Sequence, residues 1–101
     1  MVSEALRFQT TVSGWSRFRD VRVENGKVSM EIARVNCSHC ATCRRRVEHV
    51  EAALQGQAYA REFVGGGIYY SLNLPDECSG DIRKVTEFLG RTLRLDIRSA
   101  S

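Results

Sequence analysis

Proline and histidine are scarce in this chain of 101 residues, which has one proline and two histidines. No linker-like or low-complexity stretch marks a domain boundary. No apolar run approaches the roughly 18 residues that a membrane-spanning helix needs. Hydrophobic content of 43% and charged content of 27% are ordinary for a globular protein. The composition therefore predicts one domain over 1–101 and no membrane partner. The order of predicted elements divides this domain into a core at 27–99 and an extension at 1–26.

Recognisable catalytic motifs are also missing from the sequence. It shows no Ser/His/Asp set, no paired carboxylates and no glycine loop of the kind that holds phosphate between a strand and a helix. Gly65 and Gly66 lie between two predicted strands and form a turn. We therefore predict that the protein is not an enzyme. The first residues, MVSEALRFQTT, lack the apolar core of a signal peptide, so we expect a cytoplasmic protein whose thiols stay reduced.

Lysine is almost absent from the cationic residues: of 15, only Lys27 and Lys84 are not arginine. The guanidinium group is a planar fork that fits phosphate and carboxylate. Arg44, Arg45 and Arg46 stand together at the start of a predicted helix, where the helix dipole disfavours cations. A bound anion or an acidic partner would explain this placement, and so would an ordinary solvated face. The net charge of +3 permits a nucleic-acid partner without requiring one.

Hydrophobic periodicity predicts six strands and two helices. The predicted strands cover residues 6–12, 17–24, 27–35, 58–64, 67–74 and 92–98. Asn25-Gly26 predicts a type I′ hairpin turn between the second and third of these strands. One helix carries an apolar stripe from Cys43 to Leu54. The other begins near Ile82 and is expected to end at Gly90.

The order of elements from residue 27 onward is typical of the ferredoxin-like βαββαβ fold. Right-handed crossovers would place both helices on one face of the sheet. We expect the strands at 27–35 and 67–74 to be adjacent and parallel, so that the loops after them meet. The hairpin at Asn25-Gly26 requires the strand at 17–24 to pair with the strand at 27–35, both of whose edges are already occupied in the ferredoxin-like order. The strand at 17–24 therefore either pairs only with the start of 27–35 or displaces 92–98 from the edge of that strand. The prediction is an α+β fold with a ferredoxin-like core and an N-terminal hairpin that extends the sheet.

The four cysteines are the most specific chemical feature. Cys37, Cys40 and Cys43 stand three residues apart, and Cys78 lies in the loop expected to meet theirs. Four thiolates are the ligand set of a structural zinc site, and His39 is a candidate substitute ligand. The same spacing also fits an iron–sulfur cluster. Cysteine is also often a small buried hydrophobe, which is the alternative for Cys43 and Cys78.

Cys40-x-x-Cys43, followed by Val47-Glu48 and Ala53-Leu54, resembles the start of the heavy-metal-associated domain. The resemblance covers about residues 27–99 and implies a ferredoxin-like fold. It implies a two-coordinate copper(I) site on Cys40 and Cys43, as in copper chaperones. The sequence departs from that family where a methionine usually stands two residues before the first cysteine, because Ser38 occupies the position.

We therefore expect a metal-binding protein, with zinc held by the cysteine thiolates in a structural role. It would act as a binding or adaptor module whose partner is another protein. One alternative is a soft-metal chaperone or sensor of the copper type. The other is a small inhibitor or regulatory protein, of the sort that phages and mobile elements encode, which binds a protein or nucleic-acid complex through its arginines.

Overall fold

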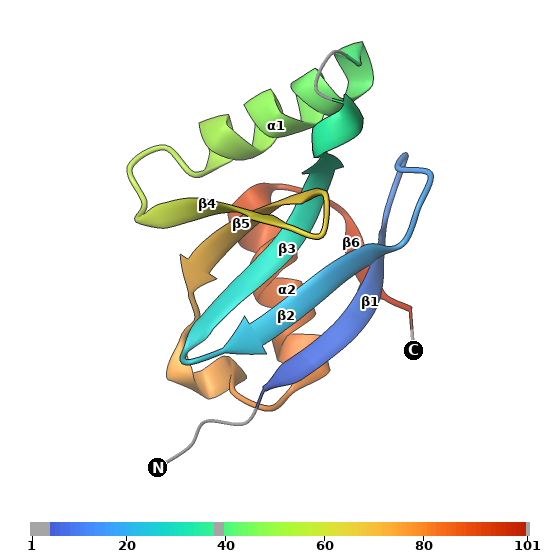
Figure 1. Ribbon diagram of the computed structural model, residues 1–101. Coiled ribbons are helices and arrows are strands. Elements are labelled where there is room, and N and C mark those ends of the chain that lie inside the picture. The colour runs from blue at the N-terminus through green and yellow to red at the C-terminus, as the bar shows by residue number, and fades with distance from the viewer. Residues whose placement is uncertain (1–4, 38–39, 101) are drawn as a thin grey trace.

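The computed structural model describes residues 5–37 and 40–100, which form one sheet with two helices packed against it (Figure 1). In chain order the elements are β1 (Leu6–Val12), β2 (Arg19–Glu24), β3 (Lys27–Arg34), a 3-10 turn η1 (Val35–Cys37), α1 (Ala41–Ala53), β4 (Tyr59–Val64), β5 (Gly67–Asn73), a 3-10 turn η2 (Asp76–Cys78), α2 (Ile82–Leu93) and β6 (Ile97–Ser99). The α+β class predicted from the sequence is confirmed.

The sheet has the strand order β4-β5-β3-β2-β1-β6, and every neighbouring pair is antiparallel. Asn25 and Gly26 have φ values of 54° and 74°, which confirms the predicted type I′ turn between β2 and β3. The N-terminal hairpin therefore extends the sheet, as expected. It does so by occupying the edge of β3, and β6 pairs with β1 instead.

The ferredoxin-like strand order is not confirmed, because β2 and β1 lie between β3 and the last strand. The predicted parallel pairing of the strands at 27–35 and 67–74 is wrong. β3 and β5 are neighbours but antiparallel, with Lys27 opposite Asn73 and Arg34 opposite Gly67. The loops that follow these two strands therefore leave opposite ends of the sheet.

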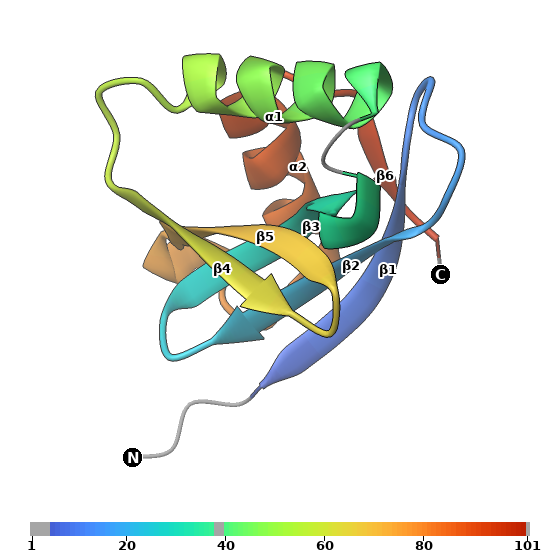
Figure 2. The ribbon, with the colours of Figure 1, turned by 45° about the horizontal axis from the view of Figure 1, so that its top comes forward.

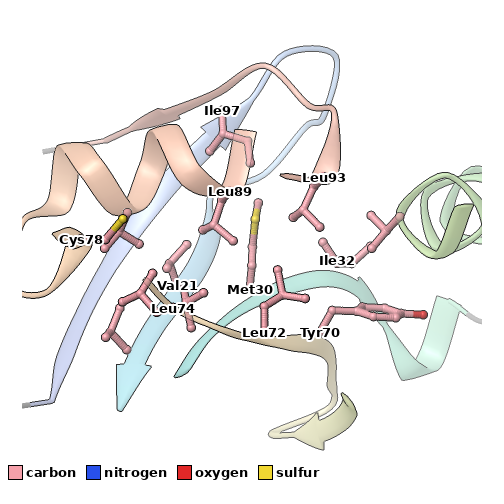
Figure 3. Close-up of a cluster of buried hydrophobic side chains, with 14 of the residues drawn as sticks. Val21, Met30, Ile32, Tyr70, Leu72, Leu74, Cys78, Leu89, Leu93 and Ile97 are labelled. Atoms are coloured by element: carbon pink, nitrogen blue, oxygen red, sulfur yellow. The ribbon is translucent and has the colours of Figure 1, made fainter. Parts of the chain in front are cut away.

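One face of the sheet carries the hydrophobic core, and both helices pack on that face. Met30 and Ile32 of β3, Val21 of β2 and Tyr70 of β5 are nearly or completely buried there. Figure 3 shows these side chains meeting the α2 residues Leu89 and Leu93. Val50 and Leu54 close the same core from α1, whose predicted apolar stripe is thus confirmed at these positions. α1 lies above the end of the sheet and α2 runs behind it (Figure 2).

α2 is longer than the sequence indicated. Gly90 does not end it, and the helix continues to Leu93, where Arg94 adopts the left-handed conformation with φ 56°. Leu93 was expected in the last strand but is a buried helix residue, and the strand is limited to Ile97–Ser99. The alternation of Leu93, Leu95 and Ile97 predicted a strand, but the same spacing also fits the end of a helix followed by a short connection.

The other face of the sheet is polar, and no helix of the described ranges 5–37 and 40–100 covers it (Figure 2). The Arg7 guanidinium lies 2.9 Å from Asp20, and the Tyr69 hydroxyl donates to the same carboxylate at 2.9 Å. Burial and the hydrogen bond to Asp20 raise the pKa of Tyr69 to about 12. A register shift between Glu31 and Ala33 interrupts β3. Hydrogen bonding thus replaces hydrophobic cover on this face.

Neither α1 nor α2, within the described ranges, is long and apolar enough to cross a bilayer.

Candidate anion interface and thiol pair

Cys78 lies far from the other cysteines, so the prediction that their loops meet is wrong. Cys40 follows the end of β3, and Cys78 follows the end of the antiparallel β5. The length of β3, about 25 Å at roughly 3.3 Å per residue, separates these two ends. Cys78 is 4% exposed and belongs to the hydrophobic core near Leu74 (Figure 3). Burial raises the pKa of the Cys78 thiol, which favours an uncharged side chain.

Cys40 and Cys43 lie at the start of α1. Cys40 is the exposed N-cap residue, and Cys43 is half-buried in the first turn. The backbone N–H groups of Cys43 and Thr42, and then the side chains of the same two residues, lower the pKa of the Cys40 thiol. A helix N-terminus stabilises a thiolate for this reason, because its backbone N–H groups have no partners inside the helix. The pair presents one accessible, easily ionised sulfur.

A closed zinc site is not assembled by the described residues. Among them no group of three or more His, Cys, Asp or Glu side chains could hold a metal ion. Cys40 and Cys43 fit two of the ligands that zinc requires, and Cys78 cannot join them from the far end of the sheet. The side chain of Cys37 and the whole of His39 lie outside the described part of the chain. The two candidates supported by position are therefore Cys40 and Cys43.

Arg44, Arg45 and Arg46 extend from the first turns of α1, as the sequence indicated. Arg44 and Arg45 are exposed and Arg46 is half-buried. The first turn of α1 contains no acidic residue, and the Cys40 side chain at its N-cap makes no capping hydrogen bond. The positive end of the helix dipole therefore meets further positive charge, an arrangement that an anion would stabilise.

Trp15 gathers two arginines at this end of the molecule. It lies in the turn between β1 and β2, close to the start of α1. The guanidinium carbon of Arg46 is 4.7 Å from the centre of the Trp15 ring, and that of Arg19 is 5.1 Å from it. Both distances are within the range of cation–π attraction. No pattern in the sequence indicates this contact, because the three residues come from separate elements.

Arg19 is a buried cation at the base of this cluster. It is 2% exposed, and its only carboxylate neighbour within salt-bridge range among the described residues is Glu31, at 3.7 Å. Its Nε atom is buried without a hydrogen-bond partner in the described part of the structure. Burial and the neighbouring Arg46 lower the pKa of Arg19, an effect that Glu31 opposes and Arg17 adds to. An unpaired buried donor costs about 1–3 kcal/mol, so Arg19 is held in this position at a cost in stability.

His49 has a structural role that sequence reasoning missed. Its Nε2–H donates to the backbone oxygens of Leu93 and Arg94, each at 3.0 Å. These carbonyls lie at the end of α2, so His49 ties α1 to the C-terminus of the second helix. His49 also lines a shallow cavity together with Trp15, Arg45 and Arg46. A histidine outside the core stripe carries no sequence signal for this contact.

No family model, no curated protein and no solved structure matches this chain. The resemblance to the heavy-metal-associated domain therefore stays a prediction.

Proposed function

We propose that the protein is a small binding module that recognises an acidic protein partner through the surface around Trp15. This Trp15 surface consists of Trp15, Arg17, Arg19, Arg45 and Arg46. One observation carries the proposal: two arginines converge on Trp15, and the buried one keeps an unpartnered Nε among the described residues. Carboxylates accept bidentate hydrogen bonds from guanidinium groups. An acidic side chain would therefore bind the accessible Arg45 and Arg46 beside Trp15 and offset the positive charge above the buried Arg19.

Two features support a protein partner more than a nucleic acid. The arginines of the Trp15 surface gather at one end of the molecule, whereas a nucleic-acid strand needs cations spread along a groove. Tryptophan and arginine are also the residues most enriched in the energetic centres of protein interfaces. Phe18, next to the cluster in sequence, is 60% exposed and adds apolar area to the same turn. The proposal is a binding function without a catalytic step.

The single tryptophan makes the test direct, since its fluorescence reports on this surface alone. Polyglutamate and a single-stranded oligonucleotide serve as probes of the two partner classes. We expect polyglutamate to quench Trp15 and to bind at least about tenfold more weakly to Arg46→Ala, a loss typical of interface arginines. Arg83→Ala is the matched control, because Arg83 is an exposed arginine on α2, away from Trp15.

Three results would count against the proposal as stated. Quenching by the oligonucleotide but not by polyglutamate would assign the surface to nucleic acid. Equal losses in Arg46→Ala and Arg83→Ala would reduce the effect to net charge. Failure of both probes to change the fluorescence at low salt, where exposed charges are least screened, would remove the anion site altogether.

A second candidate function is soft-metal binding by Cys40 and Cys43. The observation that favours it is the exposed N-cap position of Cys40, whose pKa is lowered by the first-turn amides. Soft thiolate ligands select copper(I) and zinc. Protein purified without added metal should then contain copper or zinc that is lost in Cys40→Ser and Cys43→Ser but retained in Cys78→Ser. Retention of metal in the first two variants, or absence of metal from the unchanged protein, would exclude this function.

A further inference from the structure

β4 is an open edge of the sheet. It is the first strand in the order β4-β5-β3-β2-β1-β6, so only β5 pairs with it among the described strands. Five of its six residues are exposed, and Phe63 is 65% exposed. The strand contains no proline, and of the charged side chains that can block an open edge it carries Arg61 and Glu62. Figure 2 shows β4 at the front of the sheet with no element beyond it.

The hairpin turn determines which backbone groups of β4 point outward. Gly65 and Gly66 both have positive φ, and this two-residue turn connects the paired residues Val64 and Gly67. Such a turn closes on a hydrogen-bonded pair, and hydrogen-bonded and non-hydrogen-bonded pairs then alternate along the hairpin. Val64, Glu62 and Ala60 bond to β5 on this basis. The N–H and C=O groups of Tyr59, Arg61 and Phe63 point away from β5.

We propose that a second copy of this chain pairs with β4 in an antiparallel register centred on Arg61. A twofold axis perpendicular to the sheet joins two identical edge strands antiparallel to each other and keeps their helix-bearing faces on the same side. With the axis at Arg61, Arg61 lies opposite its own counterpart and Tyr59 lies opposite Phe63. This register pairs all three outward-pointing residues, each donating one hydrogen bond and accepting one. A shift of the axis by one residue leaves one of the three unpaired.

The side chains fit the same register. Tyr59, Arg61 and Phe63 lie opposite Leu72, Tyr70 and Ile68 of β5, and so share the face that bears the helices. Each Tyr59 would therefore meet a Phe63 across the interface, and aromatic cross-strand pairs are favourable. Tyr59 already lies against Tyr70, with ring centroids 5.8 Å apart, which limits the freedom it would lose on pairing.

The charges at the axis are already compensated within each copy. Two Arg61 side chains would face each other, but each lies 3.3 Å from Glu51 on α1 of its own chain. The Tyr70 hydroxyl donates to the same Glu51 carboxylate at 2.5 Å, which holds that carboxylate in place. A second copy of this strand places Tyr59 opposite Phe63 on both sides of the axis, a match that an unrelated extended peptide would not provide, and the proposal therefore commits to a second copy. The interface is separate from the Trp15 surface, so either proposal can fail alone.

Molar mass measured by light scattering across a concentration series tests the pairing. We expect a monomer–dimer equilibrium in the unchanged protein. Tyr59→Lys or Phe63→Glu should each weaken it about tenfold or more, because each removes two symmetry-related aromatic pairs. The double variant should recover most of the loss, since the introduced lysine of each copy would then lie opposite the introduced glutamate of the other. Glu62→Gln is the matched control, as Glu62 lies on the opposite face of the same strand.

Hydrogen exchange provides a second readout that does not depend on side chains. The amides of Tyr59, Arg61 and Phe63 should become protected as concentration rises, whereas those of Ala60 and Glu62 should not change. Arg61→Pro removes an outward N–H, which an edge strand tolerates, and should abolish the dimer while circular dichroism stays unchanged. A monomer at every concentration, equal protection of both sets of amides, or a double variant as weak as the sum of its parts would overturn the proposal.

Discussion

The two helices begin in opposite ways. Asp81 caps α2 by accepting hydrogen bonds from the backbone N–H groups of Arg83 and Lys84. The start of α1 has an exposed cysteine at the N-cap and arginines in its first turns. α2 buries Val85, Leu89 and Leu93 on one face, whereas α1 buries only Val50 and Ala53 among its helical residues.

α2 thus contributes more to stability than α1, whose start exposes a thiol and arginines to the solvent. A carboxylate cap and a continuous buried stripe both lower the free energy of the folded state. An uncapped start with clustered cations raises it, and such local costs are commonly found at functional sites. This difference agrees with the binding role proposed for the start of α1, and it leads to predictions that differ between the two helices.

The largest expected difference is in thiol reactivity. Cys40 is exposed with a lowered pKa, so its alkylation should persist to lower pH than that of cysteine in the unfolded chain. Cys78 is buried with a raised pKa, and should react about a thousandfold more slowly because the chain must open first. Mass spectrometry with site localisation measures both rates. Comparable rates would show that the two ends of the molecule do not differ as described.

The raised pKa of Cys78 also has a consequence for stability. Burial favours the neutral Cys78 thiol, so this thiol stabilises the folded state fully at pH values below its pKa in the unfolded chain. The stabilisation is lost as the pH rises through the raised pKa of Cys78 in the folded protein. Cys78→Ala should therefore flatten the alkaline side of the stability curve in urea titrations. An identical curve would assign the alkaline loss to other groups, such as Tyr69 and Tyr70.

Removal of core side chains should give the next largest effect. Leu89→Ala in α2 is expected to cost about 3 kcal/mol, because the side chain is fully buried and leaves a cavity. Val47→Ala in α1 should cost only about 1 kcal/mol, since Val47 is half-buried. Urea denaturation of both variants measures the difference. Equal losses would contradict the view that α2 carries more of the core.

Substitutions at the N-caps of the two helices should give the smallest changes in the free energy of unfolding, with opposite signs. Asp81→Ala is expected to destabilise the protein by about 1 kcal/mol through loss of the two capping bonds. Cys40→Asp should stabilise it by up to about 1 kcal/mol, because a carboxylate at that position caps α1 and meets its dipole and arginines. Cys40→Ala is the control for loss of the thiol. A destabilising Cys40→Asp would mean that the start of α1 is already satisfied.

The sequence predicted correctly those features that depend on neighbouring residues. Asn25-Gly26 and Gly65-Gly66 specify two hairpins by backbone conformation alone, and the stripe ending at Leu54 specifies the buried face of α1. Pairing between distant strands was less accessible. The direction of β5 follows from the order of elements, because β4 runs parallel to β3 after α1 and the β4–β5 hairpin reverses the chain. The parallel prediction overlooked that reversal. The displacement of β6 to β1 follows from the occupation of the β3 edge by β2, which no residue of β6 encodes by itself.

The candidate site follows the same division. The arginine run and the Cys40–Cys43 pair were visible as spacing along one helix. The convergence of Arg19 and Arg46 on Trp15 was not, because it depends on how the β1–β2 turn meets α1. The expected place of Cys78 beside the other cysteines was wrong for a different reason: it took β3 and β5 as parallel, whereas the β4–β5 hairpin makes them antiparallel.

The pairing of β6 with β1 also bears on how the chain acquires its structure. Ile97 lies opposite Val12, so the last strand completes a ladder begun near the other end of the sequence. Loop closure over such a separation is slow, and during synthesis the free edge of β1 would be exposed until residues 97–99 leave the ribosome. The hairpin β1–β2 and its Trp15 turn form from local contacts. The Trp15 surface needs a further step, because Arg46 reaches Trp15 only when α1 docks beside that turn.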